Sequence, residues 1–198
     1  MGFRRTFFEF KPVSVATAAA MYVWFQGRLS LATFRDWRAR GESRPEPVPP
    51  AKLRFRVGGT FDEAGYVTSG QAIAQDIQNL CKATGHDFYS YSEVLDFGCG
   101  CGRVIQNFRG GNESCNLHAT DIDPDLVNWC KANLDGVDWH VNGHQPPLPF
   151  ADNAFDLVYA VSVFTHLDEE FQHAWLRELR RIARPGATLI LSVDGEHI

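Results

Sequence analysis

The stretch Val94-Leu95-Asp96-Phe97-Gly98-Cys99-Gly100-Cys101-Gly102-Arg103-Val104 decides the fold, because an apolar run ends in an acid and glycine then occupies every second position. The pattern predicts a strand that runs into a tight binding turn. Glycine at Gly98, Gly100 and Gly102 permits positive φ angles and lets a ligand approach main-chain N–H groups that a Cβ would shield. A dinucleotide fingerprint, Gly-x-Gly-x-x-Gly, would need glycine where Arg103 stands.

An acid follows at the distance that a nucleoside site requires. A second strand, Leu117 to Asp121, ends about 20 residues on, where an acid accepts hydrogen bonds from ribose hydroxyls. Asp123 is then a natural N-cap with Pro124 at the first helical position. Apolar residues recur at helical spacing after it: Leu126, Val127, Cys130 and Leu134. Strand, glycine loop, helix, strand, acid and helix together predict a right-handed βαβ unit.

Two further blocks complete a family resemblance. Residues 147–160 contain Leu-Pro-Phe and Phe-Asp ahead of an apolar strand, and residues 181–191 contain a Pro-Gly turn ahead of another strand. Over residues 93–193, the four blocks resemble the class I S-adenosylmethionine (SAM)-dependent methyltransferases of the small-molecule type. The resemblance implies a Rossmann-like α/β fold: a doubly wound parallel sheet of order 3-2-1-4-5 with flanking helices, here without the family's C-terminal strands.

The same resemblance assigns SAM-binding roles to individual residues. The backbone of the glycine loop is expected to receive the methionyl part, Asp96 to orient its ammonium group, Asp121 to bind the ribose diol and Ile122 to pack on the adenine. The complete expected cofactor set is Asp96, Gly98, Cys99, Gly100, Gly102, Asp121, Ile122, Asn142, Gly143, His144 and Ser162.

The adenine contact departs from the family pattern. Relatives commonly place an acid after the third strand to accept from the adenine amino group, but the stretch 141–145 offers His144 there. Either neutral His144 or the amide oxygen of Asn142 could accept that bond.

A proton acceptor for the reaction is expected after the fourth strand. His166 follows Ser162 and Thr165 at the carboxyl end of that strand, where ligands of open α/β sheets bind. A packing residue ahead of the Asp168 helix cap is the alternative interpretation of His166. The Asn/Asp-Pro-Pro-aromatic and Pro-Cys motifs of nucleic-acid methyltransferases are absent, so a nucleic-acid substrate is not expected.

Composition favours one enzyme domain with an appendage. The chain has 198 residues, of which 44% are hydrophobic, and five cysteines without a Cys-x-x-Cys pair. This usage argues against a disulfide framework and a structural zinc site, and Cys99-x-Cys101 has no further ligands nearby in sequence. We therefore expect a cytoplasmic protein with no bound metal.

Charge divides the chain unevenly. Residues 1–56 carry 11 basic and 4 acidic residues, whereas residues 57–198 carry 8 and 20. We expect a basic helical arm over 1–44, a Pro-rich linker over 45–56 and a SAM-binding domain over 57–198. The arm could contact its own acidic domain, an anionic membrane surface or an acidic partner.

Local signals give further expectations for the first 85 residues. The apolar run Val13 to Phe25 is shorter than the roughly 20 residues of a membrane span, with a signal peptide as a less favoured alternative. Ser30 is expected to cap a helix that Gly41 closes. Ser69 is expected to cap a helix that carries Ile73, Ile77 and Leu80 and ends near Gly85, which makes Tyr66 and Ser69 either cofactor contacts or ordinary loop residues.

The predicted function is transfer of a methyl group from SAM to a small-molecule, saccharide or lipid-linked acceptor. A non-catalytic SAM-binding module, an NAD-dependent oxidoreductase and a membrane-surface protein led by its basic arm are the alternatives. The chain stops soon after the fifth strand, Leu189 to Val193. We therefore expect a truncated methyltransferase whose fifth strand is an exposed edge able to self-associate.

Overall fold

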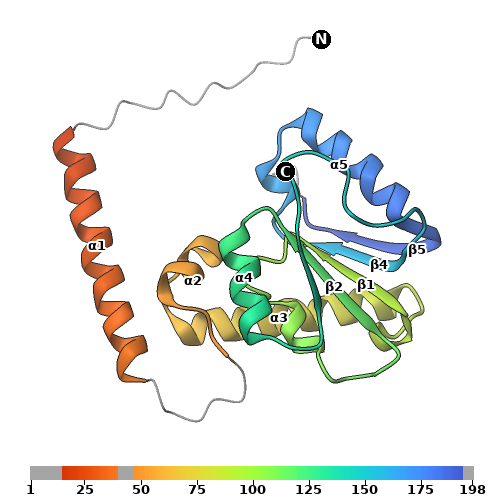
Figure 1. Ribbon diagram of the computed structural model, residues 1–198, viewed down its shortest axis with the longest axis horizontal. Coiled ribbons are helices and arrows are strands. Elements are labelled where there is room, and N and C mark those ends of the chain that lie inside the picture. Colours follow the sequence, from red (N-terminus) through yellow and green to blue (C-terminus); the bar gives the residue numbers. More distant parts are fainter. Residues whose placement is uncertain (1–14, 40–46, 194–198) are drawn as a thin grey trace. The chain divides into compact units, whose positions relative to one another are not determined.

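The computed structural model describes residues 15–39 and 47–193 (Figure 1). The chain divides into two compact units, Met1–Glu42 and Ser43–Ile198. The first unit contains helix α1 (Val15–Arg38), and the second contains the sheet and every other described helix.

The second unit is built on a five-stranded sheet in which every pair of neighbours is parallel. The strands are β1 (Glu93–Phe97), β2 (Asn116–Asp121), β3 (Asp138–Val141), β4 (Phe155–Ala160) and β5 (Ala183–Leu191). Their order, β3-β2-β1-β4-β5, confirms the predicted 3-2-1-4-5 topology. Since the chain winds outward in opposite directions from β1 and β4, the carboxyl ends of these two strands border the crevice where such sheets bind ligands.

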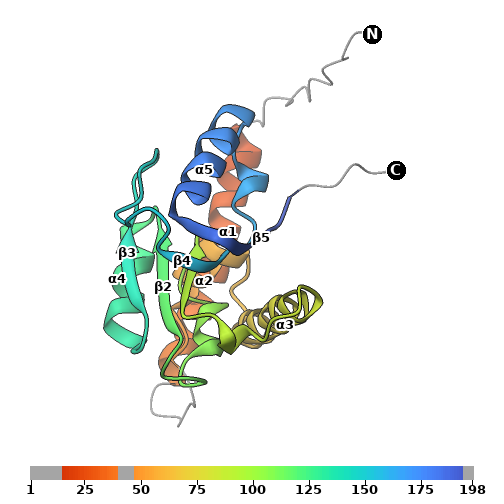
Figure 2. The ribbon, with the colours of Figure 1, turned by 90° about the vertical axis from the view of Figure 1, so that its right-hand side faces the viewer.

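Helices cover both faces of this sheet. Helices α3 (Glu63–Ala83) and α4 (Pro124–Asn133) pack on one face, where Ile77 is buried. Helix α5 (Glu169–Ile182) packs on the other face, where Trp175 is buried. In Figure 2, α5 and α3 lie on opposite sides of the sheet, as the doubly wound fold requires.

Two helices begin at their predicted N-caps. The Asp123 carboxylate accepts a hydrogen bond from the N–H of Asp125 at 3.0 Å, and Pro124 opens α4. The Asp168 carboxylate accepts from the N–H of Phe171 at 3.0 Å and opens α5. Both caps satisfy main-chain donors that a helix leaves unpaired at its start, which explains why the sequence signal was sufficient.

The expected start of α3 is wrong. Asp62, not Ser69, is the N-cap, and its carboxylate accepts from the N–H of Gly65 at 2.6 Å. Gly70 lies inside the helix. The residue at this position is glycine because a Cβ there would stand 2.3 Å from the carbonyl oxygen of Arg103. Gly70 therefore serves close packing of the helix on the glycine loop.

The expected linker over 45–56 also needs correction. Its first two residues lie outside the described part of the chain, but its second half belongs to helix α2 (Ala51–Gly58). The guanidinium of Arg54 is buried and donates to the carbonyl oxygens of Pro49 at 2.6 Å and Phe61 at 2.8 Å. These bonds make α2 a folded part of the second unit.

The helix expected after the glycine loop is only a short 3-10 turn, η2 (Ile105–Phe108). Phe108 is buried and stacks on Phe88 of a second short turn, η1 (Phe88–Ser90), with ring centroids 3.8 Å apart. Gly110 adopts a φ of 69°, a conformation that cannot continue a right-handed helix. The unit from β1 to β2 is thus joined by a turn and a loop.

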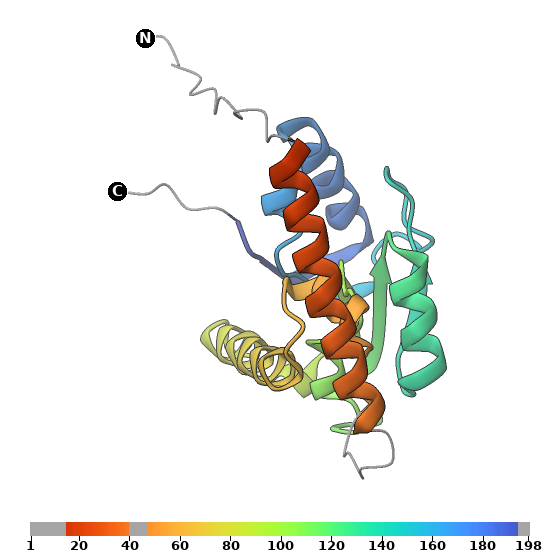
Figure 3. The ribbon, with the colours of Figure 1, turned by 90° about the vertical axis from the view of Figure 1, so that its left-hand side faces the viewer.

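Helix α1 forms the described part of the first unit. Figure 3 shows it as one helix without a break, so the expected cap at Ser30 is wrong because Ser30 lies in the helix interior. The expected closing residue, Gly41, lies outside the described residues. No helix in the described ranges combines the length and apolar character needed to cross a membrane.

Strand β5 lies at the edge of the sheet, as predicted, and pairs within the described residues only with β4. It begins at Ala183, so the expected Pro-Gly turn lies within the strand, where the register shifts between Phe155 and Leu157 of β4. Gly186 has a φ of 86° at this irregularity. A bulge therefore replaces the turn.

Candidate cofactor-binding site

A cavity of about 520 Å³ opens at the carboxyl ends of β1, β2 and β4. It lies where the strand order reverses, the position at which open α/β sheets bind ligands. Every predicted site residue except Gly102 lines it: Asp96, Gly98, Cys99, Gly100, Asp121, Ile122, Asn142, Gly143, His144, Ser162 and His166. The fold thus gathers residues that are 70 positions apart in the chain around one space.

The glycine loop serves this cavity through its shape. Gly98, Gly100 and Gly102 all have positive φ, at 81°, 58° and 69°. A Cβ on Gly98 would stand 2.2 Å from the side chain of Val163, and one on Gly100 would stand 2.9 Å from Val57. Both neighbours line the cavity, so larger residues in the loop would displace its walls.

The N–H groups of the loop are largely engaged within the protein, which corrects the expectation that they face a ligand. Those of Gly98 and Cys99 donate to the carbonyl oxygen of Thr120 at 2.8 and 2.9 Å. That of Gly100 donates to the Asp121 carboxylate at 2.7 Å. What the loop offers a ligand is therefore the space that its glycines leave open.

Asp96 lines the cavity, and one of its carboxyl oxygens has no hydrogen-bond partner among the described residues. The residue is 3% exposed, and its Oδ2 has no hydrogen-bond partner among the described residues. Burial raises the pKa of Asp96 to about 8; the Tyr159 hydroxyl opposes the shift and the Asp121 carboxylate adds to it. A buried acceptor of this kind is costly unless a donor reaches it, so the geometry fits a ligand that brings one.

Asp121 has a different role, because both of its oxygens bind main chain. One accepts from the N–H of Gly100 at 2.7 Å and the other from the N–H of Asp123 at 2.9 Å. Burial raises the pKa of Asp121, and the N–H groups of Gly100 and Ile122 oppose the shift. The carboxylate connects the glycine loop to the end of β2 and still borders the cavity.

The far side of the cavity carries a second acceptor without a partner. The Oδ1 atom of Asn142 is buried and unpartnered among the described residues, while its Nδ2 donates to the carbonyl oxygen of Gly143 at 2.9 Å. The ring of His144 instead packs edge-on against Phe171, with centroids 4.8 Å apart. Of the two predicted adenine contacts, Asn142 has the free acceptor. Ile122 is 50% exposed beside them, an apolar surface open to a flat ring.

Ser162 and His166 lie at the carboxyl end of β4, as predicted. Ser162 has a φ of 58°, unusual for a residue with a Cβ, and its N–H donates to the Ser192 hydroxyl at 2.6 Å. His166 ends the short turn η3 (Phe164–His166), in which its N–H donates to the carbonyl oxygen of Val163 at 3.0 Å. The exposed side chain of His166 borders the cavity and is accessible to an acceptor molecule.

Helix α2 contributes residues that sequence reasoning missed. Arg56 and Val57 line the cavity, and the Arg56 guanidinium forms ion pairs with Asp123 and, at 2.9 Å, with Asp125. Both residues fell in or beside the expected linker. The signal that could have found this helix is Gly59, which ends it in a left-handed conformation with a φ of 64°.

Tyr66 and Ser69 are not brought to the cavity. The buried Tyr66 hydroxyl donates to the carbonyl oxygen of Cys101 at 3.3 Å, and burial raises its pKa. The Ser69 hydroxyl donates to the carbonyl oxygen of Tyr66 at 3.0 Å and accepts from the Arg103 guanidinium at 3.4 Å. Both residues lie in helix α3 and support the glycine loop, so neither expected alternative, cofactor contact or ordinary loop residue, describes them.

Comparison with known proteins identifies the family. Residues 95–191 match the family model described as a methyltransferase domain. The chain thus contains a region similar to a methyltransferase domain, in agreement with the resemblance to class I SAM-dependent methyltransferases that its motifs predicted. The residues that match the model include all five strands from Leu95 onward and therefore most of the cavity wall.

Three curated relatives illustrate the similarity. A malonyl-[acyl-carrier protein] O-methyltransferase of Hahella chejuensis is 31% identical over 68% of this chain and 51% of its own length. A ubiquinone/menaquinone biosynthesis C-methyltransferase of Roseobacter denitrificans is 32% identical over 74% and 62%. A sterol 24-C-methyltransferase of Schizosaccharomyces pombe is 33% identical over 59% and 32%. The chain thus spans between about a third and three fifths of these relatives.

Proposed function

We propose that the cavity binds SAM and that the protein transfers its methyl group to an acceptor molecule. The observation that carries this proposal is the pair of buried acceptors without partners among the described residues, Asp96 Oδ2 and Asn142 Oδ1, both on residues that line the cavity. SAM has an ammonium group at one end, an adenine amino group at the other and a ribose diol between them. The residues present fit each of these groups.

The chain's contribution to catalysis is chiefly positional. Bound SAM supplies a methyl group already activated on a sulfonium, so that the protein needs to hold the reactants in line and exclude water. Asp96 orients the ammonium group, Asp121 holds the ribose hydroxyls while it fixes the glycine loop, and Asn142 accepts from the adenine. Ile122 covers the adenine ring.

His166 is the candidate proton acceptor. Its imidazole is exposed at the cavity's edge, where it can take a proton from a hydroxyl or acidic carbon of an incoming molecule. Because His166 is exposed, it can also serve an acceptor molecule that extends beyond the cavity.

The acceptor is proposed to be a small molecule with an apolar or lipid-linked body. Besides the polar groups, the cavity is lined by apolar side chains, among them Leu126, Val161, Val163, Leu167 and Trp175. The relatives named above act on an acyl-carrier-bound malonyl group, a sterol and a quinone precursor. A saccharide fits this lining less well.

Titration calorimetry with SAM, with its demethylated product S-adenosylhomocysteine (SAH) and with NAD tests the cofactor. We expect both adenosyl compounds to bind one per chain and NAD to be excluded, because Arg103 occupies the place of the third fingerprint glycine. Tight NAD binding in place of SAM would select the oxidoreductase alternative. SAM binding without methyl transfer to any of a quinone, sterol and acyl-carrier panel would select the non-catalytic module.

A second function, contact with an anionic membrane surface, is proposed for α1. Its exposed aromatic side chains include Trp24, Phe34 and Trp37, and the Arg28 guanidinium lies 5.1 Å from the Trp24 ring centroid. Aromatic rings among basic residues are typical of helices that bind at the headgroup level. Sedimentation with anionic but not neutral vesicles is the expected result.

Two further expectations belong to this proposal. The edge strand β5 is proposed to pair with a second chain, which concentration-dependent light scattering tests. The five cysteines are all free, in keeping with the proposed reducing, cytoplasmic compartment.

A further inference from the structure

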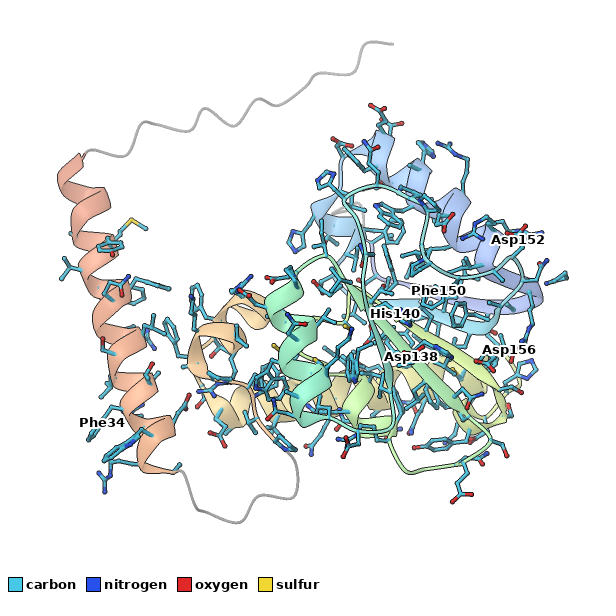
Figure 4. The ribbon with its side chains drawn as sticks, in the orientation of Figure 1. Phe34, Asp138, His140, Phe150, Asp152 and Asp156 are labelled. Carbon is cyan, nitrogen blue, oxygen red and sulfur yellow. The ribbon has the colours of Figure 1, made fainter. Side chains whose placement is uncertain are left out.

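A second group of side chains that could bind a metal ion lies where β2 pairs with β3. It precedes the ends of these strands that border the cavity. His118, Asp138 and His140 each place one ligand atom within 4.8 Å of the other two. His118 and Asp138 are register partners, and His140 follows on the same side of β3 because side chains alternate along a strand. Figure 4 shows Asp138 and His140 together on β3, with Phe150 beside them.

A carboxylate outside the trio orients His118. Glu93 Oε2 lies 2.8 Å from His118 Nε2, which makes that nitrogen the donor and leaves Nδ1 as an acceptor. This buried Nδ1 faces Asp138 Oδ2 at 3.4 Å and has no hydrogen-bond partner among the described residues. A metal cation or a proton between these two atoms would satisfy both of them. A carboxylate on the remote nitrogen is the arrangement that proteins use to orient metal-binding histidines.

The second histidine, His140, contacts the same Asp138 oxygen. His140 Nε2 lies 2.8 Å from Asp138 Oδ2. Edge-on aromatic contacts fix both rings, since His118 meets Phe155 at 5.3 Å and His140 meets Phe150 at 5.0 Å between centroids. The ligand atoms are thus positioned by packing before any ion arrives.

We propose that His118 Nδ1, the Asp138 carboxylate and His140 Nε2 bind a divalent transition-metal cation of the Zn²⁺ class. Two imidazoles and a carboxylate suit this class of ion. The separations of 2.8 and 3.4 Å, and of at most 4.8 Å for any pair of the three ligand atoms, bracket the roughly 3.4 Å between tetrahedral ligands that bind zinc at about 2.1 Å. The Asp138 side chain is 59% exposed, which gives the ion an entry path and water a fourth position.

The proposed ion would reinforce the edge of the sheet next to the cavity. Strand β3 has only four residues, one neighbour among the described strands, and leads directly into the Asn142–His144 segment of the cavity wall. A metal bridge from β2 to β3 fixes the start of that segment. The site departs from the expectation that the chain holds no metal, and its ligands were hidden because they come from two strands.

Zinc titration of the full chain tests the inference. All proteins carry Cys115→Ser, because Cys115 is a partly exposed thiol that could bind the ion by itself. We expect one Zn²⁺ per chain, release of protons on binding and a raised Tm, with a Co²⁺ absorption spectrum of nitrogen and oxygen ligation. His140→Ala should weaken binding about tenfold or more.

Three further variants complete the experiment. His173→Ala removes an exposed histidine paired with Glu169 on α5 and should bind as tightly as the parent. Asp138→Asn alters an exposed ligand and reports on the site should His140→Ala fail to fold. Glu93→Gln, a positioning change, should weaken binding less than either ligand variant. Equal zinc affinity in Asp138→Asn and His173→Ala, or no zinc uptake by the parent, would overturn the inference.

Discussion

Asp96 and Asp121 end adjacent strands and face one cavity, yet the structure uses them in opposite ways. Asp121 directs both oxygens at main-chain N–H groups, whereas Asp96 keeps Oδ2 unpartnered in a buried setting. Burial raises the pKa of both acids, and the N–H groups oppose this at Asp121. One acid therefore builds the site, and we propose that the other binds the ligand.

The largest expected effect comes from removing the building acid. Asp121→Ala leaves two N–H groups unpaired and should lower the free energy of unfolding by about 2–3 kcal/mol and weaken SAH binding by about 1.5–3 kcal/mol. Urea denaturation and calorimetry measure the two effects. Asp125→Ala, which removes only an exposed partner of Arg56, should change neither by more than about 0.5 kcal/mol. Unchanged stability in Asp121→Ala would break the comparison.

Asp96→Asn should instead separate binding from stability. We expect SAH to bind about tenfold more weakly, the loss of one charge-assisted bond. At pH 7 the wild type should release a proton when the ammonium group ionises Asp96, and the variant should release none. Calorimetry in buffers of different ionisation enthalpy measures this release. Equal release by the two proteins would contradict the role of Asp96.

The same pair predicts a pH dependence of stability. Because the pKa of Asp96 is about 8 in the folded protein and 3.8 ordinarily, the folded state holds a proton that the unfolded state has lost between these values. Its contribution is complete below pH 3.8 and declines as pH rises toward 8. Denaturation midpoints of the wild type should therefore fall relative to Asp96→Asn between pH 6 and pH 8. Parallel curves for the two proteins would refute the shift.

A smaller effect on SAH binding is expected at the residues proposed to contact the adenine. Asn142→Ala should weaken SAH binding by about 0.5–1.5 kcal/mol because it removes a neutral acceptor. His144→Ala should have less effect, since that ring packs on Phe171. The reverse order of the two variants in calorimetry would make His144 the adenine contact.

The smallest effect on SAH affinity is expected from a deletion outside the cavity, which serves as a control for the variants above. Deletion of residues 1–42, the first compact unit, should leave SAH affinity within a few-fold while it removes vesicle binding. Loss of folding in the deleted protein would show that the arm belongs to the core.

Sequence by itself determined the family resemblance, which implied the strand order, and about half of the residues that line the cavity, because the motifs follow local rules. Glycine tolerates positive φ, an aspartate caps a helix, and an acid after a second strand is diagnostic at its spacing. The caps Asp123 and Asp168 were found because each acts within three residues of itself.

Tertiary structure decided what depends on contacts between distant segments. It alone showed that Arg56 reaches the cavity, that Gly70 is a packing residue against Arg103, and that Asp96 Oδ2 lacks a hydrogen-bond partner among the described residues. It also brought His118 beside Asp138, 20 positions away, through parallel strand pairing. Burial and register arise only when the sheet assembles, and no local pattern of residue types encodes them.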